Sequence, residues 1–120
     1  MATILIIDDA VPIRLLFSTA LQSAGYDVVL ASSGREGLDL YRQKPADLVI
    51  VDMLMPDMDG MDTITELKHE FPDVKVIAVS GLVSEQSLIN SSQLLGARRT
   101  LRKPINIDEM LNMVRHELAH

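Results

Sequence analysis

Cysteine and tryptophan are absent from the 120 residues, and tyrosine and phenylalanine occur only twice each. Without cysteine the chain forms neither disulfide bonds nor thiolate metal sites, which fits a reducing compartment and favours a cytoplasmic location. Long hydrophobic runs are also missing, because Asp8 interrupts the apolar segment near the N-terminus and no basic region precedes that segment. We therefore expect neither a signal peptide nor a membrane-spanning segment.

Positive charge is in short supply as well. The chain has 11 basic and 17 acidic residues, a net charge of −6. Nucleic acid repels such a chain unless a local basic patch prevails, and the one basic cluster, ARRTLRK at 97–103, is too short for that. We therefore expect no direct binding of nucleic acid. Repeats and low-complexity linkers are not found either, so we expect one domain spanning 1–120.

Short apolar segments recur at regular intervals and predict five strands. They are TILII (3–7), DVVLA (27–31), LVIV (48–51), KVIAV (75–79) and RTL (99–101).

Amphipathic segments between these strands predict five helices. The first has Ile13, Leu16, Phe17, Ala20, Leu21 and Ala24 on one face, with Pro12 in its first turn and Gly25 at its end. The second begins at a capping box of Ser33 and Glu36, and the third follows Gly60. The fourth (84–97) is rich in Ser, Asn and Gln and should be the least stable; the fifth is capped by Asn106.

Five successive strand–helix units with almost continuously apolar strands predict an α/β fold with a parallel sheet covered on both faces. The usual five-stranded solution is the doubly wound, flavodoxin-like order 2-1-3-4-5 with five flanking helices. In such sheets the site forms at the carboxyl ends of the strands, between the first and the third.

Three carboxylates stand at these strand ends. Asp8 and Asp9 follow the first strand and Asp52 follows the third, so the topology should bring them together. Hard oxygen ligands of this kind suit Mg²⁺, whose charge would let two adjacent carboxylates stay ionised. A carboxylate beside Mg²⁺ can attack phosphorus, with a hydroxyl from Ser80 and the cation of Lys103 at two further strand ends.

Each of these residues alone also has an ordinary structural explanation. A single Asp after a strand is usually a turn or cap residue, Ser80 before Gly81 is typical of a loop, and Lys103 before Pro104 is typical of a solvated surface. The conjunction of all five at one end of the sheet is what predicts a site.

The motifs IIDDA (6–10), VDMLMPDMDG (51–60), VSG (79–81) and LRKPI (101–105) together resemble those of response regulator receiver domains, and the resemblance spans essentially the whole chain. It implies that Asp52 accepts a phosphoryl group from a sensor histidine kinase or a histidine phosphotransfer protein. It also implies that Asp8, Asp9, Asp52 and the backbone carbonyl of Leu54 hold Mg²⁺, for which Mn²⁺ should substitute.

By the same resemblance, Ser80 and Lys103 bind the phosphoryl oxygens, and the peptide bond before Pro104 is cis. Phosphorylation is then expected to change binding of a downstream protein through the surface formed by the fourth helix, the fifth strand and the fifth helix.

The chain departs from the family pattern at two places. Thr100 stands where the family usually has an aromatic residue that moves inward on phosphorylation, so we hypothesise that signalling relies more on rearrangement of the fourth predicted helix (84–97) and the loop before it. Leu54 and Leu82 stand where side chains flank the path of the hydrolytic water, which predicts a persistent phosphoryl group, although simple packing explains two leucines nearly as well.

Three other interpretations remain. HELAH (116–120) matches the zinc-peptidase motif but lacks a downstream third ligand, so a solvated helix end is favoured over a zinc site. An aspartate-nucleophile phosphatase would need a second acid where Leu54 stands. A receiver domain acting only as an unphosphorylated scaffold is the weaker option, because all five site positions are filled.

Overall fold

The computed structural model describes residues 1–53, 60–81 and 96–120. Its elements run in the order β1 (Thr3–Ile7), α1 (Val11–Ser23), β2 (Asp27–Ala31), α2 (Gly34–Gln43), β3 (Leu48–Asp52), α3 (Gly60–Glu70), β4 (Val76–Ser80), β5 (Arg99–Arg102) and α5 (Ile107–Ala119). All five predicted strands are present, with ends shifted by at most one residue. The predicted helix at 84–97 lies almost entirely outside the described residues.

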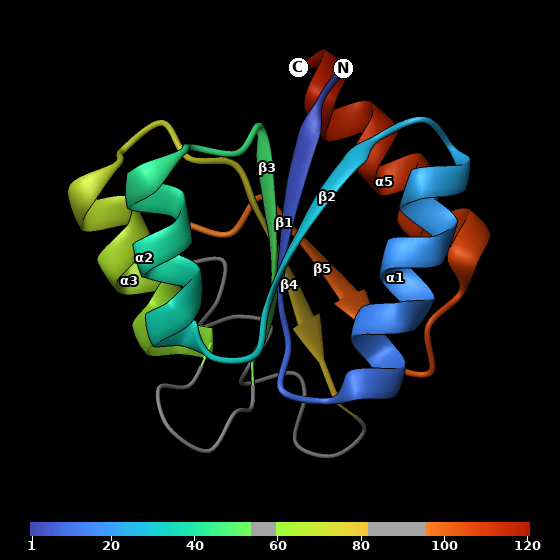
Figure 1. Cartoon of the computed structure of the whole chain (residues 1–120), viewed down its shortest axis with the longest axis horizontal. Coiled ribbons are helices and arrows are strands. Elements are labelled where there is room, and N and C mark those ends of the chain that lie inside the picture. Colours follow the sequence, from blue (N-terminus) through green and yellow to red (C-terminus); the bar gives the residue numbers. More distant parts are fainter. Residues whose placement is uncertain (54–59, 82–95) are drawn as a thin grey trace.

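The strands form one parallel sheet in the order β2-β1-β3-β4-β5, which confirms the predicted topology (Figure 1). Helices α2 and α3 cover one face, and α1 and α5 cover the other. The three central strands are buried almost throughout, whereas the two edge strands are partly exposed. Burial on both faces is why the central strands are continuously apolar.

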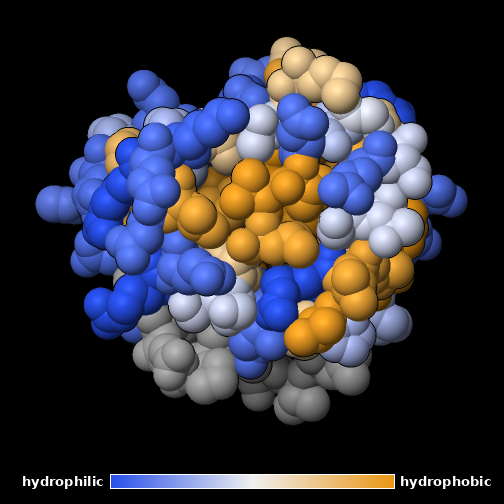
Figure 2. Space-filling view, viewed as in Figure 1, coloured by the Kyte–Doolittle hydropathy of each residue, from blue (hydrophilic) through white to orange (hydrophobic). Residues whose placement is uncertain are grey.

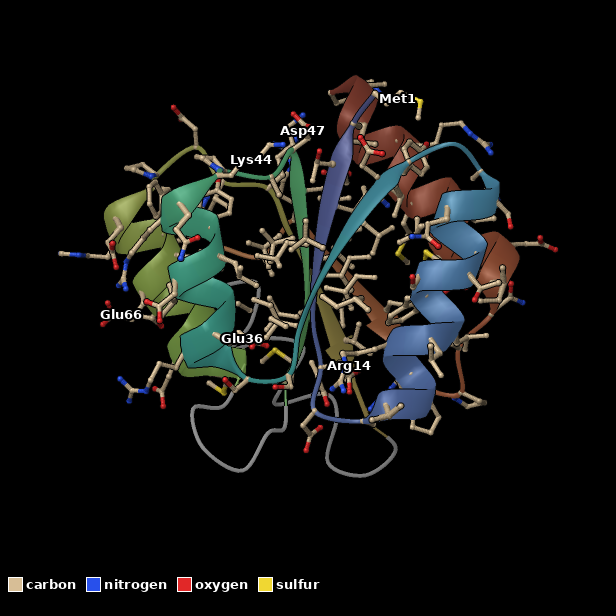
Figure 3. All side chains as sticks on the ribbon, in the orientation of Figure 1. Met1, Arg14, Glu36, Lys44, Asp47 and Glu66 are labelled. Carbon is tan, nitrogen blue, oxygen red and sulfur yellow. The ribbon has the colours of Figure 1, made fainter. Side chains whose placement is uncertain are left out.

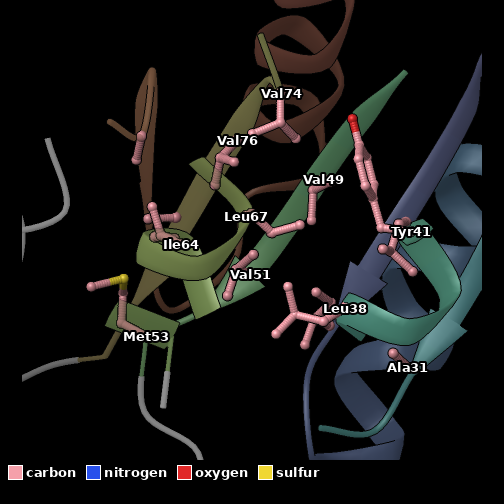
Figure 4. Packing of buried hydrophobic residues seen from close by; sticks show 14 residues of the cluster. Ala31, Leu38, Tyr41, Val49, Val51, Met53, Ile64, Leu67, Val74 and Val76 are labelled. Atoms are coloured by element: carbon pink, nitrogen blue, oxygen red, sulfur yellow. The ribbon is translucent and has the colours of Figure 1, made fainter. Parts of the chain in front are cut away.

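Alternate side chains of β1 to β4 enter two separate hydrophobic clusters, because successive side chains point to opposite faces of a sheet. One cluster joins the sheet to α2 and α3 through Leu38, Tyr41, Ile64 and Leu67 (Figure 4). The other joins it to α1 and α5 and contains Phe17, Leu21, Met110 and Val114. The core is therefore two layers divided by one sheet.

Local signals in the sequence place the helix ends. The Ser33 hydroxyl accepts a hydrogen bond from the Glu36 amide at 3.1 Å and so caps α2. Glu36 reaches back to the Ser32 amide rather than to that of Ser33, which makes the capping box looser than predicted. Asn106 caps α5 by accepting from the Glu109 amide at 2.9 Å.

The predicted apolar face of α1 is wrong at two positions, because Leu16 and Ala24 are both exposed and Ala24 is the C-cap residue after the helix. Phe17 and Leu21 are fully buried, but Leu16 is 40% exposed. Figure 2 shows apolar surface over β2 and α1, where the large exposed side chains are Val11, Leu15, Leu16 and Leu30. In the described residues no helix is long and apolar enough to cross a membrane.

Candidate functional site

The parallel sheet brings polar residues from four strands to one edge. Asp8 and Asp9 directly follow β1, Asp52 is the last residue of β3, and Ser80 is the last residue of β4. Lys103 comes directly after β5. Because β1 pairs with β3, β3 with β4 and β4 with β5, these residues lie side by side at the carboxyl ends of the strands.

The three carboxylates form one cluster. One oxygen from each of Asp8, Asp9 and Asp52 can be chosen so that all lie within 4.8 Å of one another. Asp8 and Asp52 are buried, whereas Asp9 is exposed, because the chain turns outward after β1. Among the described residues, this is the one group of three or more acidic, His or Cys side chains spaced to hold a metal ion.

Asp8 is fixed by its neighbours on one side and left open on the other. Its Oδ1 accepts a hydrogen bond from the Ala10 amide at 2.8 Å, and its backbone carbonyl accepts one from Arg14 Nη1 at 2.6 Å. Figure 3 shows Arg14 at this end of the sheet. The other carboxylate oxygen of Asp8, Oδ2, is buried and has no hydrogen-bond partner among the described residues. A buried carboxylate oxygen without a donor is costly unless a cation satisfies it.

Burial is the main reason why the pKa of Asp8 is raised, and the negative charge of Asp9 adds to the effect. The Ala10 hydrogen bond and the charges of Lys103 and Arg14 act in the opposite direction without cancelling it. The environment therefore disfavours the charged form, as expected of a carboxylate placed to meet a cation. The donor set of three clustered carboxylates and one unsatisfied buried oxygen fits a hard divalent ion such as Mg²⁺.

Lys103 brings a positive charge to the same cluster. Its Nζ lies 3.7 Å from Asp52 Oδ2, and its backbone amide donates to the Ser80 carbonyl at 2.9 Å. The Lys103–Pro104 peptide bond is cis, which confirms that prediction. The Ser80 hydroxyl is fully buried and has no hydrogen-bond partner among the described residues. A cation thus lies beside the carboxylate of Asp52, and a buried hydroxyl lies at the end of the neighbouring strand β4.

The polypeptide after Asp52 is held close to the start of α3. The Met53 amide donates to the Val79 carbonyl at 2.9 Å, and the Gly60 amide donates to the Met53 carbonyl at 3.1 Å. A Cβ on Gly60 would lie 2.2 Å from the Asp52 carbonyl oxygen, so only glycine permits this approach. The predicted ligand carbonyl of Leu54, like the side chain of Leu82, lies outside the described residues.

Two contacts of this site were not predicted from the sequence. Arg14 lies one turn into α1, and its position six residues after Asp8 was the only available signal. The close approach of Gly60 was also missed, although the DG dipeptide marked the start of the helix.

The HELAH segment comprises the last turn of α5 and its C-cap residue His120, and it lies at the other end of the strands (Figure 1). Glu117 is almost fully buried, and its carboxylate pairs with Arg98 and Arg99. Glu117 is therefore engaged in an ion-pair network and does not face a substrate as a peptidase base would. This finding supports the preference against a catalytic zinc site.

Known proteins resemble this chain along nearly its whole length. The sequence profile of the response regulator receiver domain matches residues 4–115. Sporulation initiation phosphotransferase F of Bacillus subtilis is 34% identical over 115 residues, which cover 96% of this chain and 92% of that protein. The chemotaxis protein CheY of Thermotoga maritima is 33% identical, over 92% of this chain and 95% of that protein.

A longer regulatory protein and a solved receiver domain structure are also similar to this chain. The transcriptional regulatory protein ZraR of Escherichia coli K12 is 32% identical over 98% of this chain, which spans only 26% of that protein. The crystal structure of a receiver domain protein from Clostridium thermocellum matches with a TM-score of 0.93 and 31% identity, over 99% of this chain and 95% of that one. With its sheet order, its acidic cluster and these relatives, the chain belongs to the response regulator receiver domains, the signalling modules of two-component systems.

Proposed function

We propose that the chain is a phosphorylation-activated signalling switch in which Asp52 accepts a phosphoryl group. The observation that carries this proposal is the arrangement around Asp52. Its carboxylate belongs to a cluster of three, lies 3.7 Å from the Lys103 ammonium, and stands beside the strand end that bears Ser80. Such a site holds a nucleophile and stabilises negative charge at the same point.

In the proposed reaction, a carboxylate oxygen of Asp52 attacks the phosphorus atom of a phosphohistidine. The new P–O bond gives an acyl phosphate, and the breaking P–N bond returns its electron pair to the imidazole nitrogen. Lys103 would pair with the phosphoryl oxygens, which compensates for the negative charge added beside Asp8 and Asp9. The Ser80 hydroxyl, buried without a partner among the described residues, would donate to a phosphoryl oxygen.

The residues proposed to hold Mg²⁺ are Asp8, Asp9, Asp52 and the backbone carbonyl of Leu54, and Mn²⁺ should substitute. When bound, the ion neutralises charge on the carboxylates and on the phosphoryl oxygens. The unsatisfied Asp8 Oδ2 supports this assignment, because no described protein group offers it a donor.

The proposed output is a change in partner binding at the surface formed by β5, α5 and the segment 84–97, which lies outside the described residues. The Ser80 carbonyl accepts from the Lys103 amide, so a shift of Ser80 toward a phosphoryl group would be felt at the start of this surface. Thr100 lies half-buried on β5 and lines a groove together with Arg102 and His116.

If signalling differs because Thr100 replaces the family's usual aromatic residue, Thr100→Tyr should change the affinity for a downstream partner while leaving phosphorylation of Asp52 intact. The affinity of the phosphorylated variant for the partner can be compared with that of the phosphorylated wild type. Equal affinities would contradict the hypothesis about position 100.

The family implies that a kinase or a phosphotransfer protein supplies the phosphoryl group. For this chain we propose a sensor histidine kinase or a histidine phosphotransfer protein as donor, a downstream protein as target, a cytoplasmic location, and one receiver domain spanning 1–120.

The decisive experiment is phosphorylation by acetyl phosphate with and without Mg²⁺, followed by intact-mass measurement. We expect wild type to gain one phosphoryl group only with the metal and Asp52→Ala to gain none. Asp73→Asn is the matched control, because Asp73 is exposed and follows α3 at the other end of the sheet. Metal-independent labelling, or labelling of Asp52→Ala, would overturn the proposal, and a wild type without any labelling would favour the scaffold alternative.

A further inference from the structure

Two histidines lie together at the C-terminal end of α5, His116 in its last turn and His120 directly after it as the C-cap residue. His116 and His120 are four residues apart and therefore project from the same side of the helix. Their ring centroids are 4.1 Å apart, with 39° between the ring planes. Both side chains are exposed. The pair is thus formed before any ligand binds, and solvent can reach it.

The ring nitrogens of this pair are available. Among the described residues, the one polar contact of the His116 ring is Nε2 to Glu117 Oε2 at 3.8 Å, which is too long for a hydrogen bond. Glu117 is already engaged, because its Oε2 accepts from Arg99 Nε at 3.1 Å and Arg98 pairs with its other oxygen. Within the described part of the chain, no hydrogen bond occupies either imidazole.

We propose that His116 and His120 together chelate a divalent transition-metal ion such as Zn²⁺, with water completing the coordination. Imidazole nitrogens suit Zn²⁺, Cu²⁺ and Ni²⁺, whereas carboxylate clusters suit Mg²⁺. Two histidines at this spacing on a helix can bind one such ion from one side. The site is separate from the acidic cluster, and it does not depend on the proposed phosphorylation of Asp52.

The surroundings leave room for a hydrated ion. His116 lines a shallow groove of about 570 Å³ together with Arg99, Glu109, Asn112 and Met113. The groove opens to solvent beside α5, so that an ion at His116 can keep bound water or accept a ligand from a partner. Because Glu117 is committed to its arginines, the glutamate of the HELAH motif is not available as the general base of a peptidase, and the proposed site is structural or regulatory.

A metal ion bound by the two histidines would be connected to the sheet through the residue between them. Residue 117, between the two histidines, accepts a hydrogen bond from Lys75 Nζ at its backbone carbonyl (2.7 Å) and contacts Arg99 at the start of β5 through its carboxylate. A metal bridging one turn of α5 would stabilise the helical form of the turn that makes these contacts. It would do so at the opposite end of the strands from the carboxylates (Figure 1).

The test is calorimetric titration of the 120-residue protein with Zn²⁺ in buffer that contains excess Mg²⁺, so that the acidic cluster is occupied. We expect one Zn²⁺ per chain. Loss of an outer-shell partner already costs about 10–100-fold in metal affinity, so His116→Ala and His120→Gln should each weaken binding at least about tenfold. His69→Ala is the matched control, because His69 is the third histidine and lies exposed on α3.

Proton NMR of the imidazole rings gives a second readout. Zn²⁺ should shift the ring signals of His116 and His120 and leave those of His69 unchanged, and it should raise the melting temperature of wild type but not that of His120→Gln. Wild-type affinity in both helix variants, no binding by wild type, or equal loss in His69→Ala would overturn the proposal. Circular dichroism verifies that each variant is folded.

Discussion

Asp8 and Asp9 are adjacent in the sequence but differ in environment. Asp8 is 1% exposed, with one oxygen lacking a donor among the described residues, while Asp9 faces solvent. Burial therefore raises the pKa of Asp8 above its ordinary value of 3.8. A cost of this kind at one residue indicates a group placed for function rather than for stability.

This residue leads to a prediction about pH. Because the folded-state pKa of Asp8 is raised, its stabilising contribution is complete below the ordinary value of 3.8 and is lost as the pH rises through the folded-state pKa. At pH 7 without metal, Asp8 of the wild type is ionised, and the folded state bears the whole cost of burying that charge. Asp8→Asn should therefore increase the free energy of unfolding at pH 7 by more than the roughly 0.5 kcal/mol typical of a neutral surface change.

Urea unfolding of metal-free wild type and Asp8→Asn between pH 3 and pH 8 measures this effect. The difference in free energy of unfolding between Asp8→Asn and wild type should shrink as the pH falls below the folded-state pKa of Asp8. Mg²⁺ should stabilise wild type more than the variant. Asp73→Asn should show no such trend, since Asp73 is exposed. A less stable Asp8→Asn protein at pH 7 without metal would contradict the assignment.

At the scale of elements, the start of α3 packs against the end of β3 without space for a side chain. A Cβ on Gly60 would come within 2.2 Å of the Asp52 carbonyl oxygen and 2.4 Å of Met53 Cα. Both contacts are to backbone, which cannot rotate away. The helix and the strand that bears Asp52 must separate to accept any larger residue.

Gly60→Ala should therefore lower the free energy of unfolding by about 1–3 kcal/mol, the usual cost of overpacking. Gly81→Ala is the matched control for stability, because Gly81 also follows a strand and a Cβ there would meet no atom of the described residues within 4 Å. Chemical denaturation of both variants measures the difference. Equal stabilities of the two variants would contradict the close approach seen here.

The end of α5 is joined to the start of β5 by two ion pairs, in which the buried Glu117 carboxylate meets the partly exposed side chains of Arg98 and Arg99. Burial is the largest influence on Glu117 and opposes its ionisation, but the Arg99 hydrogen bond and the charge of Arg98 together outweigh it and lower its pKa. Its stabilising contribution is therefore present above the ordinary value of 4.5 and is lost as the pH falls through the folded-state pKa.

Glu117→Gln should lower the free energy of unfolding at pH 7 by about 1–3 kcal/mol, between the values for exposed and for fully buried pairs, because both arginines are partly exposed. The deficit relative to wild type should diminish below pH 4.5. Thermal unfolding of both proteins from pH 3 to pH 7 measures it. A deficit that is constant with pH would show that packing, not charge, is responsible.

At the scale of the whole molecule, a single sheet separates two hydrophobic clusters. Phe17 on α1 belongs to one and Ile64 on α3 to the other, and both are fully buried. The same strands supply alternate side chains to both clusters, so neither layer can lose its packing without exposing the sheet. A domain built in this way should unfold in one cooperative transition.

Phe17→Ala should cost about 3–5 kcal/mol and Ile64→Ala about 2–5 kcal/mol. Leu15→Ala, at a residue 58% exposed on α1, should stay within about 0.5 kcal/mol of wild type. Calorimetry should show a single transition whose midpoint falls in both core variants. Two separate transitions in either core variant would contradict the shared sheet as the unit of stability.

The sequence by itself determined the order of the elements, the caps at Ser33 and Asn106, and the strand ends that bear Asp8, Asp52 and Ser80. Periodicity and capping are local properties, and a parallel sheet places every strand end at the same edge, so local signals were sufficient there. They could not show which side of the turn after β1 would be buried, and so did not separate Asp8 from Asp9.

Only the tertiary structure decided the remaining features. It buried Glu117 beside Arg99, left Leu16 exposed, and set the ammonium of Lys103 at 3.7 Å from the Asp52 carboxylate. Each of these depends on a segment far away in the sequence, because burial and electrostatic environment come from what packs against a residue. A residue's own pattern records which face of its helix or strand it occupies, but not which distant group it will meet there.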